Sequence, residues 1–126
     1  MKKRITLILT VVFLLTIGTV ALASSPITLN VAPGKNPRTA GYTFSNGTAS
    51  FTCKCYLAGS NDTIRVFLDV YETRNGKTDW YERASHNFTS NGSYTLKYNT
   101  TNKARLRTYG YKENAGSGTV VVTVNN

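Results

Sequence analysis

The chain has 126 residues, with 15 Lys or Arg against 6 Asp or Glu, for a formal net charge of +9. This length suits a single domain with a thin core. It contains only one His and two Cys. That composition leaves few residues for a metal centre and argues against most enzyme classes.

The first residues have the pattern of a secretory leader. Residues 2–4 are basic, residues 5–20 carry no charge, and residues 21–23 form the small-x-small sequence that signal peptidase accepts. The uncharged run is shorter than the ~20 residues of a membrane-spanning helix. We therefore expect a cleavable signal peptide at 1–23, a mature protein that starts at Ser24, and a secreted or cell-surface location.

The mature charge is unevenly distributed. Without the three leader bases, 12 basic residues remain against 6 acidic ones. Residues 24–82 have a net charge of only +1, whereas residues 83–126 have +5. The basic leader and the strands rich in Asn, Gly, Thr and Tyr are typical of a small secreted bacterial protein.

Apolar and polar residues alternate with a period of two in much of the mature chain, which is the mark of half-buried strands. A short strand is expected in a Pro-interrupted arm at residues 24–40. The clearest alternating segments are 27–31, 50–57, 63–71, 94–98 and 119–124. Residues 80–88 are ambiguous, because Trp80, Ala84 and Phe88 suit a core while Glu82 and His86 share their parity; a bulge would resolve this.

Turn signals separate these segments. Asn75-Gly76 is the dipeptide of a tight hairpin turn, and Asn46-Gly47 and Asn91-Gly92 repeat it. No segment has a helical stripe. We predict an all-β domain at residues 41–126, an antiparallel sandwich of seven or eight strands, with a small barrel as the alternative.

Cys53 and Cys55 are two residues apart on a predicted strand. Their Cα atoms would be about 6.6 Å apart with parallel side chains, at the upper limit for a disulfide. Two buried thiols are therefore the favoured interpretation. A strained disulfide, with a redox role if exposed, stays open, as does pairing between chains or a soft-metal site.

Catalytic chemistry has little support. His86 is the only histidine and has no Ser-His-Asp context. The carboxylates of residues 69–82 are expected to pair with nearby bases rather than to form an acid pair across a cleft. The bases concerned are Arg65, Arg74, Lys77 and Arg83. We predict no enzyme activity, no cofactor and no metal site.

A basic and aromatic strand face is the main candidate site. Alternation gathers Arg105, Arg107, Tyr109 and Tyr111 on one outward face, and a short loop is expected to set Lys97 on the neighbouring strand beside them. Arg binds carboxylate or phosphate bidentately, and Tyr stacks on sugar rings. The alternative is a solvated face that only keeps the protein soluble.

The sequence thus predicts a secreted, non-catalytic binding module. Its basic-aromatic face would engage an anionic partner such as a cell-wall polymer, a membrane surface or a glycan. No motif indicates specific nucleic-acid binding. A secreted antagonist of the bacteriocin or toxin kind, and a self-assembling surface protein with pairing strand edges, are the alternatives.

Overall fold

The computed structural model describes residues 25–111 and 116–126, so the predicted signal peptide lies outside the described residues. The described residues contain seven strands and no helix, and hence no helix that could cross a membrane. The strands are β1 (Ile27–Val31), β2 (Thr48–Leu57), β3 (Ile64–Arg74), β4 (Lys77–Phe88), β5 (Gly92–Asn99), β6 (Ala104–Gly110) and β7 (Gly118–Val124).

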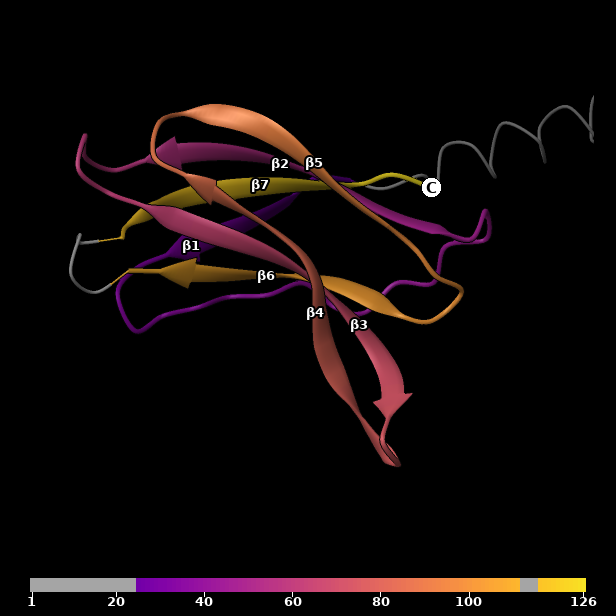
Figure 1. Ribbon diagram of the computed structural model, residues 1–126. Helices are drawn as coiled ribbons and strands as arrows, with labels where there is room; N and C mark the ends of the chain where they lie inside the picture. The colour runs from indigo at the N-terminus through magenta and orange to yellow at the C-terminus, as the bar shows by residue number, and fades with distance from the viewer. Residues whose placement is uncertain (1–24, 112–115) are drawn as a thin grey trace, which may run out of the picture.

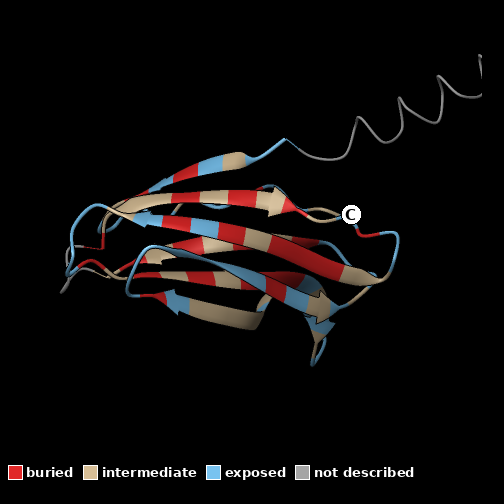
Figure 2. Ribbon diagram, turned by 90° about the horizontal axis from the view of Figure 1, so that it is seen from above, coloured by how far each residue is buried: buried red, intermediate tan, exposed pale blue. Residues whose placement is uncertain are grey.

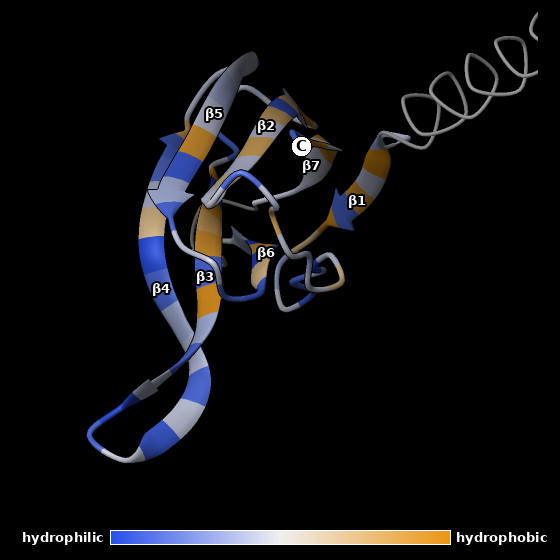
Figure 3. Ribbon diagram, turned by 90° about the vertical axis from the view of Figure 1, so that its right-hand side faces the viewer, coloured by the Kyte–Doolittle hydropathy of each residue, from blue (hydrophilic) through white to orange (hydrophobic). Residues whose placement is uncertain are grey.

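The strands form two antiparallel sheets that pack face to face. One has four strands in the order β1-β7-β2-β5, and the other has three in the order β4-β3-β6. Figures 1 and 3 show the two layers, with the β3–β4 hairpin extending beyond the sandwich. The predicted all-β sandwich is confirmed, and the barrel alternative is wrong.

The core lies between the sheets and follows the predicted alternation. Buried and less buried residues alternate along the strands in Figure 2. The inward side chains of β2 include Phe51, Cys53 and Cys55, and those of β3 include Val66 and Leu68; all five are fully buried. Burying an aliphatic or aromatic side chain contributes roughly 1.5–3 kcal/mol, so these alternating residues hold the sheets together.

The β3–β4 hairpin turns at Asn75-Gly76, where both residues have positive φ (50° and 77°), as the dipeptide predicted. A β-bulge interrupts its ladder between Leu68 and Asp69. Leu68 pairs with residue 84 and Asp69 with residue 82, so Arg83 is the extra residue. The bulge resolves the ambiguity of residues 80–88.

Because the bulge changes the parity of β4, Trp80 does not face the core as its hydrophobicity suggested. It pairs with Tyr71, and its indole lies 5.2 Å from the Tyr71 ring on the outer side of the sheet. Ala84 and Phe88, beyond the bulge, do pack against the core.

The predicted N-terminal arm is integrated into the sandwich. Its short strand, β1, pairs with β7. Residues 37–42 then run along the free edge of β6, with hydrogen bonds from Thr39 N–H to Leu106 O (2.8 Å), from Tyr42 N–H to Ala104 O (2.8 Å) and from the Thr108 hydroxyl to residue 37 O (2.6 Å). This strap covers an edge that would otherwise be open to pairing.

Candidate functional site

The outer face of the three-stranded sheet gathers long charged and aromatic side chains. Directly paired residues of antiparallel strands share a face, and the β3–β6 register pairs Asp69 with Arg105, Phe67 with Arg107, and Arg65 with Tyr109. Tyr71 and Trp80 continue this face toward the hairpin. We call this set the platform: Arg65, Phe67, Asp69, Tyr71, Trp80, Arg105, Arg107 and Tyr109.

Asp69 is the buried centre of the platform. Only 2% of its side chain is exposed. Its Oδ2 accepts hydrogen bonds from Arg105 Nε (3.2 Å) and Arg107 Nε (2.8 Å), and its Oδ1 accepts a second from Arg107 Nη2 (3.2 Å). The Arg107 contact is bidentate, the geometry in which guanidinium binds carboxylate most firmly. One carboxylate thus fixes two guanidinium groups.

Both guanidinium groups also lie over aromatic rings. Arg105 Cζ is 4.2 Å from the centroid of Trp80, and Arg107 Cζ is 4.0 Å from that of Phe67. Arg65 Cζ lies 5.2 Å from the same Phe67 centroid. Such distances allow cation–π attraction. The contacts therefore form an unbroken row from Tyr71 to Arg65 along β3.

Further cations lie at the margin of the platform. The backbone of Arg38 in the strap forms an isolated antiparallel β-bridge with Arg107. Its side chain therefore shares the face of Arg107, and it is exposed. Gly41 of the strap lies against Trp80, since a Cβ there would be 3.0 Å from Cη2 of the indole and 3.5 Å from Cδ of Lys103. Strap and platform are in direct contact.

The structure separates one predicted site residue from the others. Lys97 is exposed on β5, which pairs with β2 in the four-stranded sheet. The expectation that β5 lies beside β6 is wrong, because the chain crosses from one sheet to the other between these strands. Lys97 is therefore not adjacent to Arg105 and Arg107.

The remaining predicted residues stay together. Arg105 and Arg107 are central to the platform, and Tyr109 lies beside them on β6. Tyr111 follows the strand, with its ring 5.1 Å from that of Tyr109 in an edge-to-face contact. Neither arginine is freely solvated, however: the side chains are 13% and 32% exposed.

The expected pairing of acids with nearby bases is confirmed, but the partners of Asp69 were missed. The ion pairs of the hairpin strands are Arg65–Glu82, Arg74–Glu72, Arg83–Glu72 and Lys77–Asp79. Asp69 instead binds residues 36 and 38 positions away. The sequence did contain a signal for this site. Asp69 alternates with Phe67 and Tyr71 on the outward side of the predicted strand, so an acid lies between two aromatic residues on one face.

On the other face of the hairpin, a carboxylate again holds two arginines that lie over aromatic rings. Glu72 accepts a hydrogen bond from Arg74 and forms an ion pair with Arg83. Arg74 lies over Tyr81 at 4.5 Å, and Arg83 lies over Tyr98 of β5 at 5.2 Å. Two carboxylates, one on each face, thus brace the long hairpin where it leaves the sandwich.

Cys53 and Cys55 are free, buried thiols on the inward side of β2, so the disulfide that the sequence left open is not formed. Burial raises the pKa of Cys53 to about 12, with the neighbouring Cys55 adding to the effect, and raises the pKa of Cys55 to about 11. Both stay protonated at neutral pH and are poor nucleophiles.

His86 lies outside the platform. Its ring stacks on Tyr94 of β5 with the centroids 3.8 Å apart, and burial lowers its pKa. Within the described residues, no three His, Cys, Asp or Glu side chains gather in a way that could hold a metal ion.

No family model matches the chain, and no curated protein matches it. Its fold is similar to that of PirA, with a TM-score of 0.55 and 11% identity over 81% of this chain and 94% of that one. Weaker likenesses include the Yersinia pseudotuberculosis-derived mitogen (TM-score 0.48, 10% identity, 80% and 83% covered). Another is the CBM22-1 xylan-binding domain from Paenibacillus barcinonensis (TM-score 0.40, 14% identity, 80% and 82% covered).

At these identities the likenesses show the fold alone. The chain is a small two-sheet β-sandwich of the kind found in PirA. One outer face of this sandwich carries the platform.

Proposed function

We propose that the chain is a secreted, non-catalytic module that binds an anionic extracellular glycan polymer on the platform. The observation that carries the proposal is the unbroken row of stacked guanidinium and aromatic groups from Tyr71 to Arg65. This row follows the solvent-facing side of a sheet rather than a cleft. Polymer binding needs such an extended surface, whereas catalysis on a small substrate needs converging groups in a pocket.

The two chemistries of the platform match the two parts of an acidic sugar. Tyr71 and Trp80 offer ring surface to the apolar face of a pyranose. Three guanidinium groups, of Arg65, Arg105 and Arg107, face two carboxylates, Asp69 and Glu82, so a net charge of +1 is left for carboxylate or phosphate groups of the ligand. At a strand rise of ~3.4 Å, the row from residue 65 to residue 71 is about 20 Å long, enough for several sugar units.

Preorganisation supports the same proposal. Asp69 and the stacked rings already fix Arg105 and Arg107, so little side-chain entropy would be lost on binding. Arg38 and Lys103 at the margin are the freer charges and would pair with the polymer at the rim. The antagonist and self-assembly alternatives stay predictions from the sequence.

A matched pair of tyrosines tests the proposal. Tyr71 on the platform and Tyr56 on the opposite sheet are each 44% exposed. We expect Tyr71→Ser to weaken binding to bacterial cell-wall material about tenfold, a loss of ~1.4 kcal/mol, and Tyr56→Ser to leave it unchanged. Co-sedimentation with intact wall and with wall stripped of its phosphate-rich polymers gives both affinities.

Charge is tested with a second pair of exposed residues, Arg38 at the platform and Lys54 on β2. Arg38→Gln should weaken binding and reduce its salt dependence, since exposed charges are screened beyond ~8 Å at physiological ionic strength. Lys54→Gln should change neither. Equal binding to intact and stripped wall, equal effects of the two tyrosine variants, or preferential binding to anionic lipid vesicles would overturn the proposal.

A further inference from the structure

Cys53 and Cys55 lie on an inner strand of the four-stranded sheet. β2 pairs with β5 on one side and with β7 on the other. Cys53, Lys54 and Cys55 each have one partner on β5 and one on β7, and the register of both ladders runs unbroken through them. The backbone that joins the two cysteines is therefore that of a regular strand, held from both sides.

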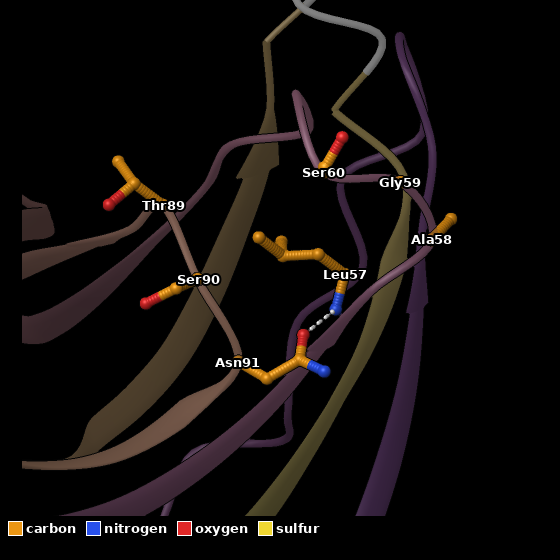
Figure 4. Close-up of a pocket in the computed structure, with 7 residues that line it drawn as sticks. All are labelled: Leu57, Ala58, Gly59, Ser60, Thr89, Ser90 and Asn91. Atoms are coloured by element: carbon orange, nitrogen blue, oxygen red, sulfur yellow. Dashed lines mark hydrogen bonds between the residues drawn. The ribbon is translucent and has the colours of Figure 1, made fainter.

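Hydrogen bonds to other segments fix β2 toward both of its ends. At one end the Leu57 N–H donates to Asn91 Oδ1 at 2.8 Å (Figure 4). Toward the other end, the Asn125 N–H donates to Ser50 O at 2.9 Å, and Asn125 Nδ2 donates to Thr52 Oγ1 at 2.9 Å. The stretch that contains the cysteines thus has little freedom to slide or to bend.

A regular strand holds the two cysteines too far apart for a disulfide. Residues i and i+2 on one face are about 6.6 Å apart at Cα, and their Cα–Cβ bonds point the same way, so the Cβ atoms are similarly separated. A disulfide needs Cβ atoms about 3.5–4.5 Å apart, which is closer by roughly 2 Å or more. Closing that gap would kink β2 and break its pairing with a neighbouring strand.

The two thiols are also surrounded by packed side chains. Both are fully buried, as are Phe51 on the same face of β2 and Val120 and Val122 on β7. Because protein cores are close-packed, a kink here would displace these neighbours. A bond between Cys53 and Cys55 and the native core therefore exclude each other.

Folding also changes the reactivity of the pair. The thiolate is the form that reacts with an oxidant. In the native protein burial raises the pKa of Cys53 to about 12 and that of Cys55 to about 11, whereas an unperturbed cysteine has a pKa of about 8.5. At pH 8 the unfolded chain therefore has accessible thiolate, and the native protein has almost none.

We propose that Cys53 and Cys55 form a redox-sensitive folding switch. In the unfolded chain a two-electron thiol oxidant of the diamide class joins them. Two S–H bonds break, one S–S bond forms, and two protons and two electrons pass to the N=N bond of diamide, which becomes a hydrazine. The oxidised chain cannot form the four-stranded sheet until a reductant restores both thiols, and the folded, reduced chain resists the same oxidant.

The switch acts on folding and is independent of any ligand of the platform. Its test treats the mature protein with diamide at pH 8 and low protein concentration, once in urea and once in buffer. Intact mass and thiol counting should show an intrachain disulfide in urea. Oxidation in buffer should be at least about 1,000-fold slower, since a fraction of only about 10⁻³ or less of a marginally stable domain is unfolded at any moment.

Refolding is the second measurement. On dilution from urea, the reduced chain should regain its native circular dichroism and Trp80 emission, and the oxidised chain should not. Dithiothreitol added to the diluted, oxidised chain should then restore both signals. This recovery attributes the block to the disulfide rather than to irreversible damage, because only the S–S bond is reversed by the reductant.

The matched controls are the single-cysteine variants Cys53→Ala and Cys55→Ala, since each keeps one thiol but cannot form the bond. Both should refold equally well with and without diamide treatment; where a variant is too unstable to refold, the dithiothreitol recovery of the parent decides. Native refolding with the disulfide intact, equal oxidation rates in urea and buffer, no intrachain disulfide in urea, or a diamide-dependent block in a single-cysteine variant would contradict the switch.

Discussion

The side chains on the two outer faces of the sandwich are held by different kinds of contact. On the four-stranded sheet, short neutral side chains bond to one another: Thr52 to Thr95, Thr48 to Asn99 at 3.1 Å, and Asn125 to Thr52 at 2.9 Å. On the three-stranded sheet, long charged and aromatic side chains depend on one buried carboxylate. A change on the first face removes one weak bond, whereas a change on the second leaves a charge without its partner.

The largest effect should come from removing both guanidinium partners of Asp69. Arg105→Gln/Arg107→Gln would leave this carboxylate buried and unpaired, and we expect a loss of about 3–5 kcal/mol in the free energy of unfolding. The sequence alone placed the two arginines on an outward strand face and gave no sign of a buried partner. Urea denaturation measures the loss, and a stability close to that of the parent would mean that Asp69 is not the centre of the platform.

The next effect concerns the inward side of β2. Since burial raises the pKa values of Cys53 and Cys55 to about 12 and 11, almost no thiolate exists below about pH 9. Thiol reagents should label neither cysteine in the native protein at pH 8 and both in urea without reductant. Mass spectrometry after a labelling pulse reports this; fast native labelling would place the thiols at the surface.

A smaller effect is expected where the strap meets the platform. The Cβ of Gly41→Ala would come within 3.0 Å of Trp80, so the indole must shift, at a cost of about 1 kcal/mol. Trp80 is the only tryptophan, and its fluorescence reports the shift directly. Gly92→Ala is the control, because no atom lies within 4 Å of the added carbon; identical emission from both variants would count against the contact.

The smallest effect belongs to the neutral face. Thr52→Val/Thr95→Val removes an exposed hydroxyl pair but adds two good strand formers, so the free energy of unfolding should change by less than about 0.5 kcal/mol. A loss as large as that of the double arginine variant would abolish the contrast between the two faces. Thermal unfolding with the parent as reference is sufficient.

The sequence predicted the strands and their inward residues well, because period-two alternation depends only on local pattern. Phe51 and Val66 face the core as their parity required. The Asn75-Gly76 turn was predicted equally well, since the tendency toward positive φ is a local property of these two residues.

The pairing of strands was not predictable in the same way. Alternation says which side of a strand is buried but not which strand lies next to it, so Lys97 was placed beside Arg105 although β5 belongs to the other sheet. The contacts of Asp69 with Arg105 and Arg107 were missed for the same reason, because these residues become neighbours only through the β3–β6 register. The bulge at Arg83 was required by the pattern but had no local marker of its position.

The place of β7 has a consequence for the order of events during export. This strand is the last of the described strands, yet it lies between β1 and β2 and is the only described strand that pairs with β1. In a chain that is secreted N-terminus first, as we propose, β1 emerges early and waits for nearly the whole polypeptide before it can pair. Pairing over such a separation in sequence is slow to form. In such an export the four-stranded sheet would close only after β7 had emerged.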